Sequence, residues 1–282
     1  MAMERPMSTG AGDAWKAGDV ASGWQKGVAA REQALTPVTE LMFHMAGVSA
    51  GMRVLDLGAG TGDQTVLAAQ RTGPGGSVLA TDISGPMLDI ARNSAVAAGL
   101  ANIETRVMDA QDLDLPSGSF DAAIARFSLQ FVPDVQRALV GVRRVLKPGG
   151  RLAVVVFSSV ERNAFRAAPQ AIASRLAGQP FPAPGPGQWA LNDPGTLESV
   201  LQRAGFRDVE SRAVPFVYRF DSLAEAVRNV RESQPPLVRL LDLLTEAERS
   251  AAWAEIERTF SAYAGPDGFA GPAEALIGVG TA

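Results

Sequence analysis

The stretch VLDLGAGTGD at residues 54–63 decides the fold of this 282-residue chain. A short apolar run leads to a carboxylate, three glycines follow at alternate positions, and residues that favour a helix come next. Strand, glycine turn and helix in this order are typical of the nucleotide-binding opening of an α/β sheet. Alternate glycines let the backbone turn with positive φ and bring bare main chain against a ligand. The stretch therefore predicts a nucleotide site at Gly58, Gly60 and Gly62.

Carboxylates around this loop bear on which nucleotide it binds. Asp56 precedes the first glycine, Asp63 stands at the start of the expected helix, and Asp82 ends the next expected strand. A dinucleotide would place its pyrophosphate at that helix N-terminus, where three carboxylates would repel it. A positively charged nucleoside suits such a cleft better. S-adenosylmethionine has a sulfonium, an ammonium group, a ribose and no phosphate.

Three further stretches accompany the first: TDISGPML at 81–88, MDAQDLDLPSGSFDAAIA at 108–125 and RVLKPGGRLAVVVF at 144–157. In order and spacing, the four resemble the class I S-adenosylmethionine-dependent methyltransferases over roughly residues 45–160. The resemblance is greatest to their small-molecule branch, the ubiquinone/menaquinone C-methyltransferase-like group.

The resemblance implies an α/β fold, a doubly wound, seven-stranded and mostly parallel sheet whose last strand is antiparallel, with helical lid or cap insertions. It also implies S-adenosylmethionine as the cofactor. The implied cofactor-binding residues are Asp56, Gly58, Gly60, Gly62, Asp82, Ile83, Met87, Asp109, Ala110 and Arg126.

The position of four of these residues has a physical basis. Asp56, Asp82, Asp109 and Arg126 fall at the carboxyl ends of expected strands, where ligands of open α/β sheets bind. The resemblance implies that Asp56 and the glycine loop hold the methionine end of the cofactor. It assigns Asp82 to the ribose hydroxyls, and the main chain at Arg126 to the amino group.

Four of the implied residues concern the adenine. The resemblance implies that Ile83 and Met87 flank the ring, and that Asp109 and Ala110 read its edge. The side chain of Asp109 would accept a hydrogen bond from the exocyclic amine.

The core is expected at residues 47–160, 193–220 and 265–282, with lid or cap insertions at 161–192 and 221–264. The resemblance suggests that an N-terminal helical segment, residues 1–46, covers the cofactor site. Within the core, Lys147–Gly150 is expected to be a turn that precedes a strand at 151–157.

Aromatic residues mark the segments outside the core. Trp24 either covers the sulfonium through a cation–π contact or pins the N-terminal helix to the body. Phe181 and Trp189 lie beside a proline-rich run and indicate a substrate wall rather than a solvated linker.

Composition excludes several classes of function. Apolar residues make up 46% of the chain, the net charge is −4, there is no cysteine, and the single histidine is His44. We therefore expect no nucleic-acid partner, no metal site and no disulfide. Lacking an apolar run long enough to span a bilayer and a leader pattern, the sequence favours a cytoplasmic protein. It leaves the oligomeric state open.

The expected activity is transfer of a methyl group to a small acceptor, apolar or aromatic because the insertions contain Phe, Trp and Pro. No catalytic residue is assigned, because the candidate bases His44, Glu161, Tyr218 and Tyr263 stand in no motif.

Two alternatives stay open. The first is a protein that binds the cofactor without methyl transfer, as a regulator or in a cofactor-assisted rearrangement. The second is an NAD-dependent oxidoreductase, which the third glycine disfavours because Asp63 occupies its place in a GxGxxG pattern.

Overall fold

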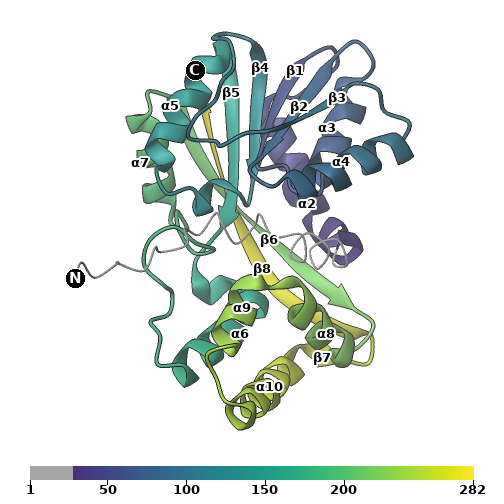
Figure 1. Ribbon diagram of the computed structural model, residues 1–282, viewed down its shortest axis with the longest axis vertical. Coiled ribbons are helices and arrows are strands. Elements are labelled where there is room, and N and C mark those ends of the chain that lie inside the picture. Colours follow the sequence, from purple (N-terminus) through teal and green to yellow (C-terminus); the bar gives the residue numbers. More distant parts are fainter. Residues whose placement is uncertain (1–27) are drawn as a thin grey trace, which may run out of the picture.

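The computed structural model describes residues 28–282, which form one twisted sheet flanked by helices (Figure 1). The main strands follow the order β3-β2-β1-β4-β5-β8-β6, and the short β7 pairs with β8 off this path. The strands are β1 (Arg53–Leu57), β2 (Ser77–Asp82), β3 (Ile103–Val107), β4 (Phe120–Arg126), β5 (Leu146–Phe157), β6 (Arg207–Phe220), β7 (Ala264–Gly265) and β8 (Gly268–Thr281).

The strand directions confirm the expected fold. β1 to β5 are parallel to one another, and β8 lies antiparallel between β5 and β6. The seven strands of the main path are therefore doubly wound and mostly parallel, with the last long strand reversed.

Helices cover both faces of this sheet. α2 and α3 pack on one face, and α5 and α7 on the other (Figure 1). Successive side chains of a strand point to opposite faces, so Val54 joins the first cluster of buried residues while Leu55 and Leu57 join the second. The sheet helices are α2 (Val28–Ala46), α3 (Asp63–Thr72), α4 (Gly85–Ala97), α5 (Val135–Val145) and α7 (Pro194–Arg203).

A second lobe lies below the parallel strands in Figure 1, where the long strands β6 and β8 extend beyond the rest of the sheet. Its helices are α6 (Ala164–Leu176), α8 (Leu223–Ser233), α9 (Pro235–Leu241) and α10 (Glu246–Phe260). Rings from α6, α10 and the two strands form its core: Phe165 contacts Tyr218, Phe220, Phe260 and Phe269, with ring centroids 4.8–5.6 Å apart. Short 3-10 helices lie at Leu129–Phe131, Val160–Arg162 and Ser261–Tyr263.

One expected boundary is wrong. β5 begins at Leu146 rather than at residue 151, so Lys147–Gly150 belongs to the strand. Phe120 already pairs with Leu146 before the register shifts, and Gly149 has φ +82° inside this irregularity. A bulge of this kind keeps the strand continuous where the sequence indicates only a turn.

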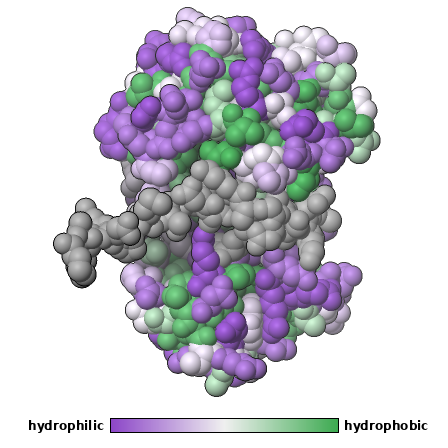
Figure 2. Space-filling view, in the orientation of Figure 1, coloured by the Kyte–Doolittle hydropathy of each residue, from purple (hydrophilic) through white to green (hydrophobic). Residues whose placement is uncertain are grey.

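Within residues 28–282, no helix is long and apolar enough to span a membrane. On the face drawn in Figure 2, hydrophilic and hydrophobic side chains are interspersed on both lobes. The large apolar side chains that are most exposed, Val96, Leu243 and Val107, come from separate elements. Single exposed apolar residues of this kind are ordinary on a protein surface.

Candidate functional site

A cavity of about 290 Å³ lies at the carboxyl ends of the parallel strands and extends toward the second lobe. This volume is at the lower end of the range for small-molecule sites. Among the ten residues expected to bind a cofactor, those that line the cavity are Gly58, Gly60, Asp82, Ile83, Met87, Asp109, Ala110 and Arg126. The other two, Asp56 and Gly62, lie outside its wall.

The glycine loop is held by bonds within the protein. The amides of Gly58 and Ala59 donate to the Thr81 carbonyl at 2.7 and 3.0 Å, the Gly62 amide donates to the Ala59 carbonyl at 3.0 Å, and the Gly60 amide donates to Asp82 at 2.9 Å. Gly58 has φ +66°, and a Cβ there would lie 2.3 Å from that of Ser128. The loop thus approaches the cavity with its amides already bonded.

Gly62 has a packing role that explains its place outside the cavity. It has φ +86°, and a Cβ there would lie 2.7 Å from the Cβ of Ala91 on α4. A side chain at this position would force α4 away from the loop.

Asp82 ends β2 and connects the loop to the next helix. Its two carboxylate oxygens accept hydrogen bonds from the amides of Gly60 and Ser84, each at 2.9 Å. Burial raises the pKa of Asp82, and the amide hydrogen bonds oppose that shift. Ser84 in turn accepts from the Met87 amide at the start of α4, which fixes Met87 against the cavity.

Asp56 lies behind the glycine loop, outside the cavity wall. It is fully buried in β1 and accepts hydrogen bonds from the side chains of Gln64, at 3.1 Å, and Thr65, at 2.6 Å. Burial raises its pKa to about 6, against these two hydrogen bonds. Its direct role is to hold the first turn of α3.

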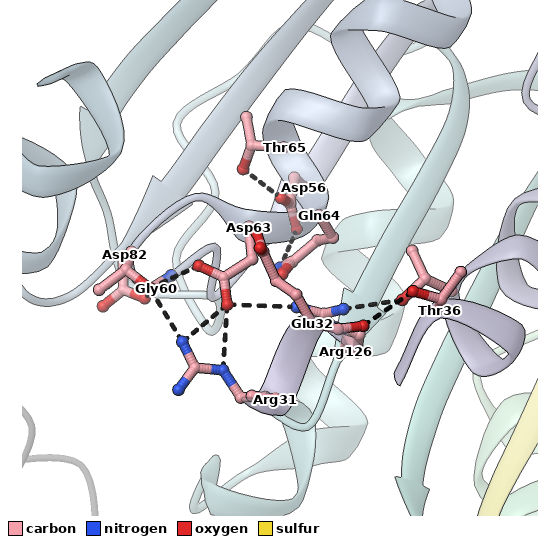
Figure 3. Close-up of polar contacts among 12 residues, drawn as sticks. Arg31, Glu32, Thr36, Asp56, Gly60, Asp63, Gln64, Thr65, Asp82 and Arg126 are labelled. Carbon is pink, nitrogen blue, oxygen red and sulfur yellow. Dashed lines mark hydrogen bonds and ion pairs between the residues drawn. The ribbon is translucent and has the colours of Figure 1, made fainter. Parts of the chain in front are cut away.

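Asp63 is the centre of a buried ion network (Figure 3). Arg31 of α2 donates to it twice, at 3.0 and 2.7 Å, and Arg126 of β4 lies 3.7 Å away. Thr61 donates to its other oxygen at 2.7 Å. Burial alone would raise the pKa of Asp63, but the charges of Arg31 and Arg126 outweigh it and hold that pKa below its ordinary range.

These contacts correct the electrostatic argument made from the sequence. We expected Asp56, Asp63 and Asp82 to surround the cleft as three uncompensated charges. Asp56 lies outside the cavity wall, and Asp63 is neutralised by arginine. Repulsion of a phosphate therefore does not follow from these carboxylates.

The expected adenine positions lie together on one side of the cavity. Ile83 and Met87 come from the β2–α4 junction, and Asp109 and Ala110 follow β3. The carboxylate of Asp109 accepts hydrogen bonds from the amide and side chain of Gln111, at 2.8 and 3.1 Å.

The other end of the cavity contains residues that the sequence did not single out as a site. They share a position at the junction of the two lobes, and they are Phe127, Gln130, Phe157, Arg166, Gln188, Ser233 and Gln234. No sequence pattern marks them, because they come from six different segments.

The candidate bases are separated by the structure. Tyr218 lines the cavity at the second lobe and is only 2% exposed. His44 and Glu161 are exposed, and these two and Tyr263 lie outside the cavity wall. Among residues 28–282, no group of His, Cys, Asp and Glu could hold a metal ion. Trp24 lies outside the described residues.

Aromatic rings line the cavity, but they are not the two residues from which the sequence predicted a wall, Phe181 and Trp189. Phe157 lines the cavity and stacks on Phe127, with ring centroids 4.3 Å apart. Trp189 packs against Phe157 at 5.8 Å, and Phe181 against Trp189 at 6.2 Å. Phe181 and Trp189 therefore support the wall from outside it.

Comparison with known proteins finds methyltransferases that are similar to this chain. Residues 38–179 match the ubiE/COQ5 methyltransferase family. The ubiquinone/menaquinone biosynthesis C-methyltransferase of Teredinibacter turnerae is 41% identical over 122 residues, which is 43% of this chain and 49% of that protein. The chain thus spans about half the length of the curated ubiquinone/menaquinone enzymes it matches.

Two other proteins are similar over more of the chain. The nocamycin O-methyltransferase of Saccharothrix syringae is 29% identical over 248 residues, 81% of this chain and 84% of that protein. The structure of Haemonchus contortus phosphoethanolamine N-methyltransferase 2, solved with phosphomonomethylethanolamine and S-adenosylhomocysteine, is 18% identical. Its TM-score is 0.56, and the likeness covers 90% of this chain and 56–57% of that one. At this identity it shows a shared fold.

Proposed function

Because the chain belongs to the ubiE/COQ5 methyltransferase family, we propose that it transfers a methyl group from S-adenosylmethionine to a small-molecule acceptor. The observation that carries this proposal is one continuous cavity with two different ends. One end is formed by the glycine loop, Asp82 and Met87, and the other by aromatic rings and amides at the second lobe.

The loop supports a cofactor without phosphate. The amides of Gly58, Ala59, Gly60 and Gly62 all donate within the protein. A pyrophosphate takes free backbone donors at such a loop, and these four amides are already bonded within the protein. A carboxylate at the end of β2, such as Asp82, can accept hydrogen bonds from the two ribose hydroxyls.

The proposed cofactor contacts follow from the lining residues. The loop and Arg126 would surround the methionine end, Asp82 would bind the ribose, and Ile83 and Met87 would flank the adenine. Asp109 with Ala110 would meet the edge of the ring. Asp56 and Gly62 would contribute indirectly, through the first turn of α3 and its packing on α4.

Methyl transfer requires little acid–base catalysis from the protein. S-adenosylmethionine supplies the reactive methyl group, and the protein must align donor and acceptor and exclude water. The lining residues Leu129, Phe157 and Tyr218 are buried and give the cavity a dry wall. A general base is needed only where the acceptor loses a proton in the transition state.

The insertions complete the site. Segment 161–192 supplies Arg166 and Gln188 to the cavity, and segment 221–264 supplies Ser233 and Gln234, which supports their role as a substrate wall. The expected domain boundaries and a cytoplasmic location stay predictions of the sequence.

Calorimetric titration tests the proposal. S-adenosylhomocysteine, the demethylated cofactor, is expected to bind with micromolar affinity, about −8 kcal/mol, and NAD is expected not to bind. Binding of NAD alone would contradict the assignment of the cofactor. Binding of S-adenosylhomocysteine without a methylated product from any acceptor would favour the alternative of a protein that binds the cofactor without methyl transfer.

A further inference from the structure

The cavity contains a buried cation that the cofactor contacts do not use. Arg166 of α6 is 6% exposed and lines the cavity at the second lobe. Its guanidinium makes two long hydrogen bonds to the Tyr218 hydroxyl, at 3.4 and 3.3 Å. It also lies 5.1 Å from the centroid of the Tyr218 ring and 6.0 Å from that of Phe157.

Arg166 differs from the other buried arginines of the cavity. Arg31 and Arg126 both lie within 4.0 Å of the Asp63 carboxylate. In the part of the chain that the structure describes, no ion pair joins Arg166 to a carboxylate. A guanidinium stays charged in proteins, and a buried charge is costly unless it is paired. The missing partner is therefore expected to come from a ligand.

Unpartnered amides lie on the wall of the same cavity. Both polar atoms of Gln130 and of Gln234 are buried without a hydrogen bond among the described residues, and so is Nε2 of Gln188. Gln130 and Gln234 are each 1% exposed. Buried polar side chains nearly always have partners, so donors and acceptors at this end also await a ligand.

The side-chain amide of Gln170 lies just behind the cavity wall, and it does have hydrogen-bond partners. Gln170 accepts a hydrogen bond from the Trp189 indole at 3.0 Å and donates to Oε1 of Gln188 at 3.0 Å. Among the described residues, the unpaired amide atoms of Gln130, Gln188 and Gln234 lie on the cavity wall, and two further unpaired atoms, Nε2 of Gln136 and Nε of Arg151, lie away from it. The stacked rings of Phe127 and Phe157 add a flat apolar face to the cavity wall.

We propose that the acceptor is a flat unsaturated molecule that carries an anionic oxygen group, and that Arg166 binds this group as its counterion. Gln130, Gln188 and Gln234 complete the hydrogen bonds of the acceptor, and the Phe127–Phe157 pair contacts its ring. This inference rests on the proposed function and names the substrate class of the same site. The anionic oxygen belongs to a carboxylate or to an ionised enol.

Matched pairs of probes test the charge separately from the shape. The protein is saturated with S-adenosylhomocysteine and titrated in a calorimeter with 2-naphthoate and with its neutral isostere 2-naphthamide. A second pair is 4-hydroxycoumarin, an acidic enol, and neutral coumarin. The anionic member of at least one pair is expected to bind about tenfold more tightly, the effect of one charge-assisted contact. The pair that shows the preference identifies the carboxylate or the enol as the source.

Variants then assign the preference to one residue. Arg166→Gln is expected to abolish the tenfold preference while the affinity for the neutral probe stays within about twofold, and Arg166→Lys is expected to restore part of it. Arg162→Gln is the matched control, because Arg162 is four residues away and exposed. S-adenosylhomocysteine should bind all three variants as it binds the wild type.

The outcomes separate the two proposals. If S-adenosylhomocysteine binds, but anionic and neutral probes bind equally or both fail to bind, the inference about Arg166 is overturned and the proposed function stands. If S-adenosylhomocysteine does not bind, the proposed function fails, and the same probe pairs titrated alone still decide whether the wild type prefers the anion. A preference that persists in Arg166→Gln would also overturn the inference.

Discussion

The two ends of the cavity treat their polar groups in opposite ways. At the cofactor end, Asp56, Asp63, Asp82 and Asp109 all accept hydrogen bonds from neighbouring protein groups. At the other end, the side-chain amides of Gln130 and Gln234 have no hydrogen-bond partner among the described residues, and Arg166 has two long hydrogen bonds to Tyr218 but no carboxylate there. The first end is therefore complete before a ligand arrives, whereas the second is completed by its ligand.

This difference between the two ends matches the ligands that they are proposed to bind, a common cofactor and a particular acceptor. A fixed loop with bonded amides presents one shape, which suits a cofactor common to a whole family. Unpaired buried groups make a site selective, because a ligand that fails to satisfy them leaves their desolvation uncompensated. The insertions, which supply most of the unpaired groups, are thus the segments that set acceptor choice.

At the cofactor end of the cavity, called the completed end below, the substitution with the largest expected effect is Asp63→Asn. The change leaves Arg31 and Arg126 buried without their shared anion, and loss of one partner from a buried pair costs about 3–5 kcal/mol in the free energy of unfolding. Because the pKa of Asp63 is lowered in the folded state, this stabilisation is present at neutral pH and is lost as the pH falls.

Urea denaturation measures the effect of Asp63→Asn. Glu40→Gln is the control, since Glu40 pairs with Arg71 at 2.6 Å where the two side chains are 55% and 37% exposed. That variant should lose at most about 1 kcal/mol. Similar losses in both variants would mean that burial of the Asp63 network has no special weight.

The sequence could predict the completed end because its causes are local. Glycines, a strand-end carboxylate and a helix cap lie within a few residues of one another, so the loop from Gly58 to Gly62 and the turn from Asp82 to Ser84 can be recognised as motifs. Arg31 could not be found in this way. It stands 32 residues before Asp63, and only the packing of α2 on the sheet brings the two together.

The second end was hidden for the same reason. Arg166, Gln188 and Gln234 belong to three segments without a motif, and an isolated glutamine in a sequence is more often a solvated residue. Phe181 and Trp189 did indicate an aromatic wall, but in the structure they pack behind Phe157 and do not face the cavity. Composition can suggest an apolar pocket without saying which residue faces it.

A second test of the completed end uses the pH dependence of Asp56→Asn. The folded pKa of Asp56 is about 6 and its ordinary value is 3.8, so the folded state binds the proton more tightly than the unfolded chain. The wild type should therefore lose stability as the pH rises from about 4 to 6 and level off above. Relative to Asp56→Asn, which has no such titration, the loss amounts to roughly 3 kcal/mol.

Unfolding free energies of the two proteins at a series of pH values check this expectation. Other titrating groups are common to both chains and cancel in the difference. A difference that is constant across the range would show that Asp56 titrates alike in both states.

The third test measures cofactor binding at the completed end. Asp82→Ala should weaken S-adenosylhomocysteine by roughly 1–3 kcal/mol, because charge-assisted hydrogen bonds to the ribose are lost and the Gly60 and Ser84 amides lose their acceptor. Asp89→Ala is the control on the adjacent helix, where the carboxylate is exposed and pairs with Arg92. Unchanged affinity in Asp82→Ala would remove Asp82 from the ribose assignment.

The smallest expected effect separates the two ends most directly, through glutamines of one chemistry in two settings. Gln64 donates to Asp56, so Gln64→Met should lower the free energy of unfolding by about 1–3 kcal/mol, as expected when a buried acceptor loses its donor. Gln130→Met removes an amide that has no partner among the described residues, so it should leave stability unchanged or raise it by up to about 1 kcal/mol. Thermal and urea unfolding of the ligand-free proteins give both values. A clear destabilisation by Gln130→Met would mean that this amide is already satisfied in solution, and the contrast between the completed end and the ligand-completed end would then fail at that residue.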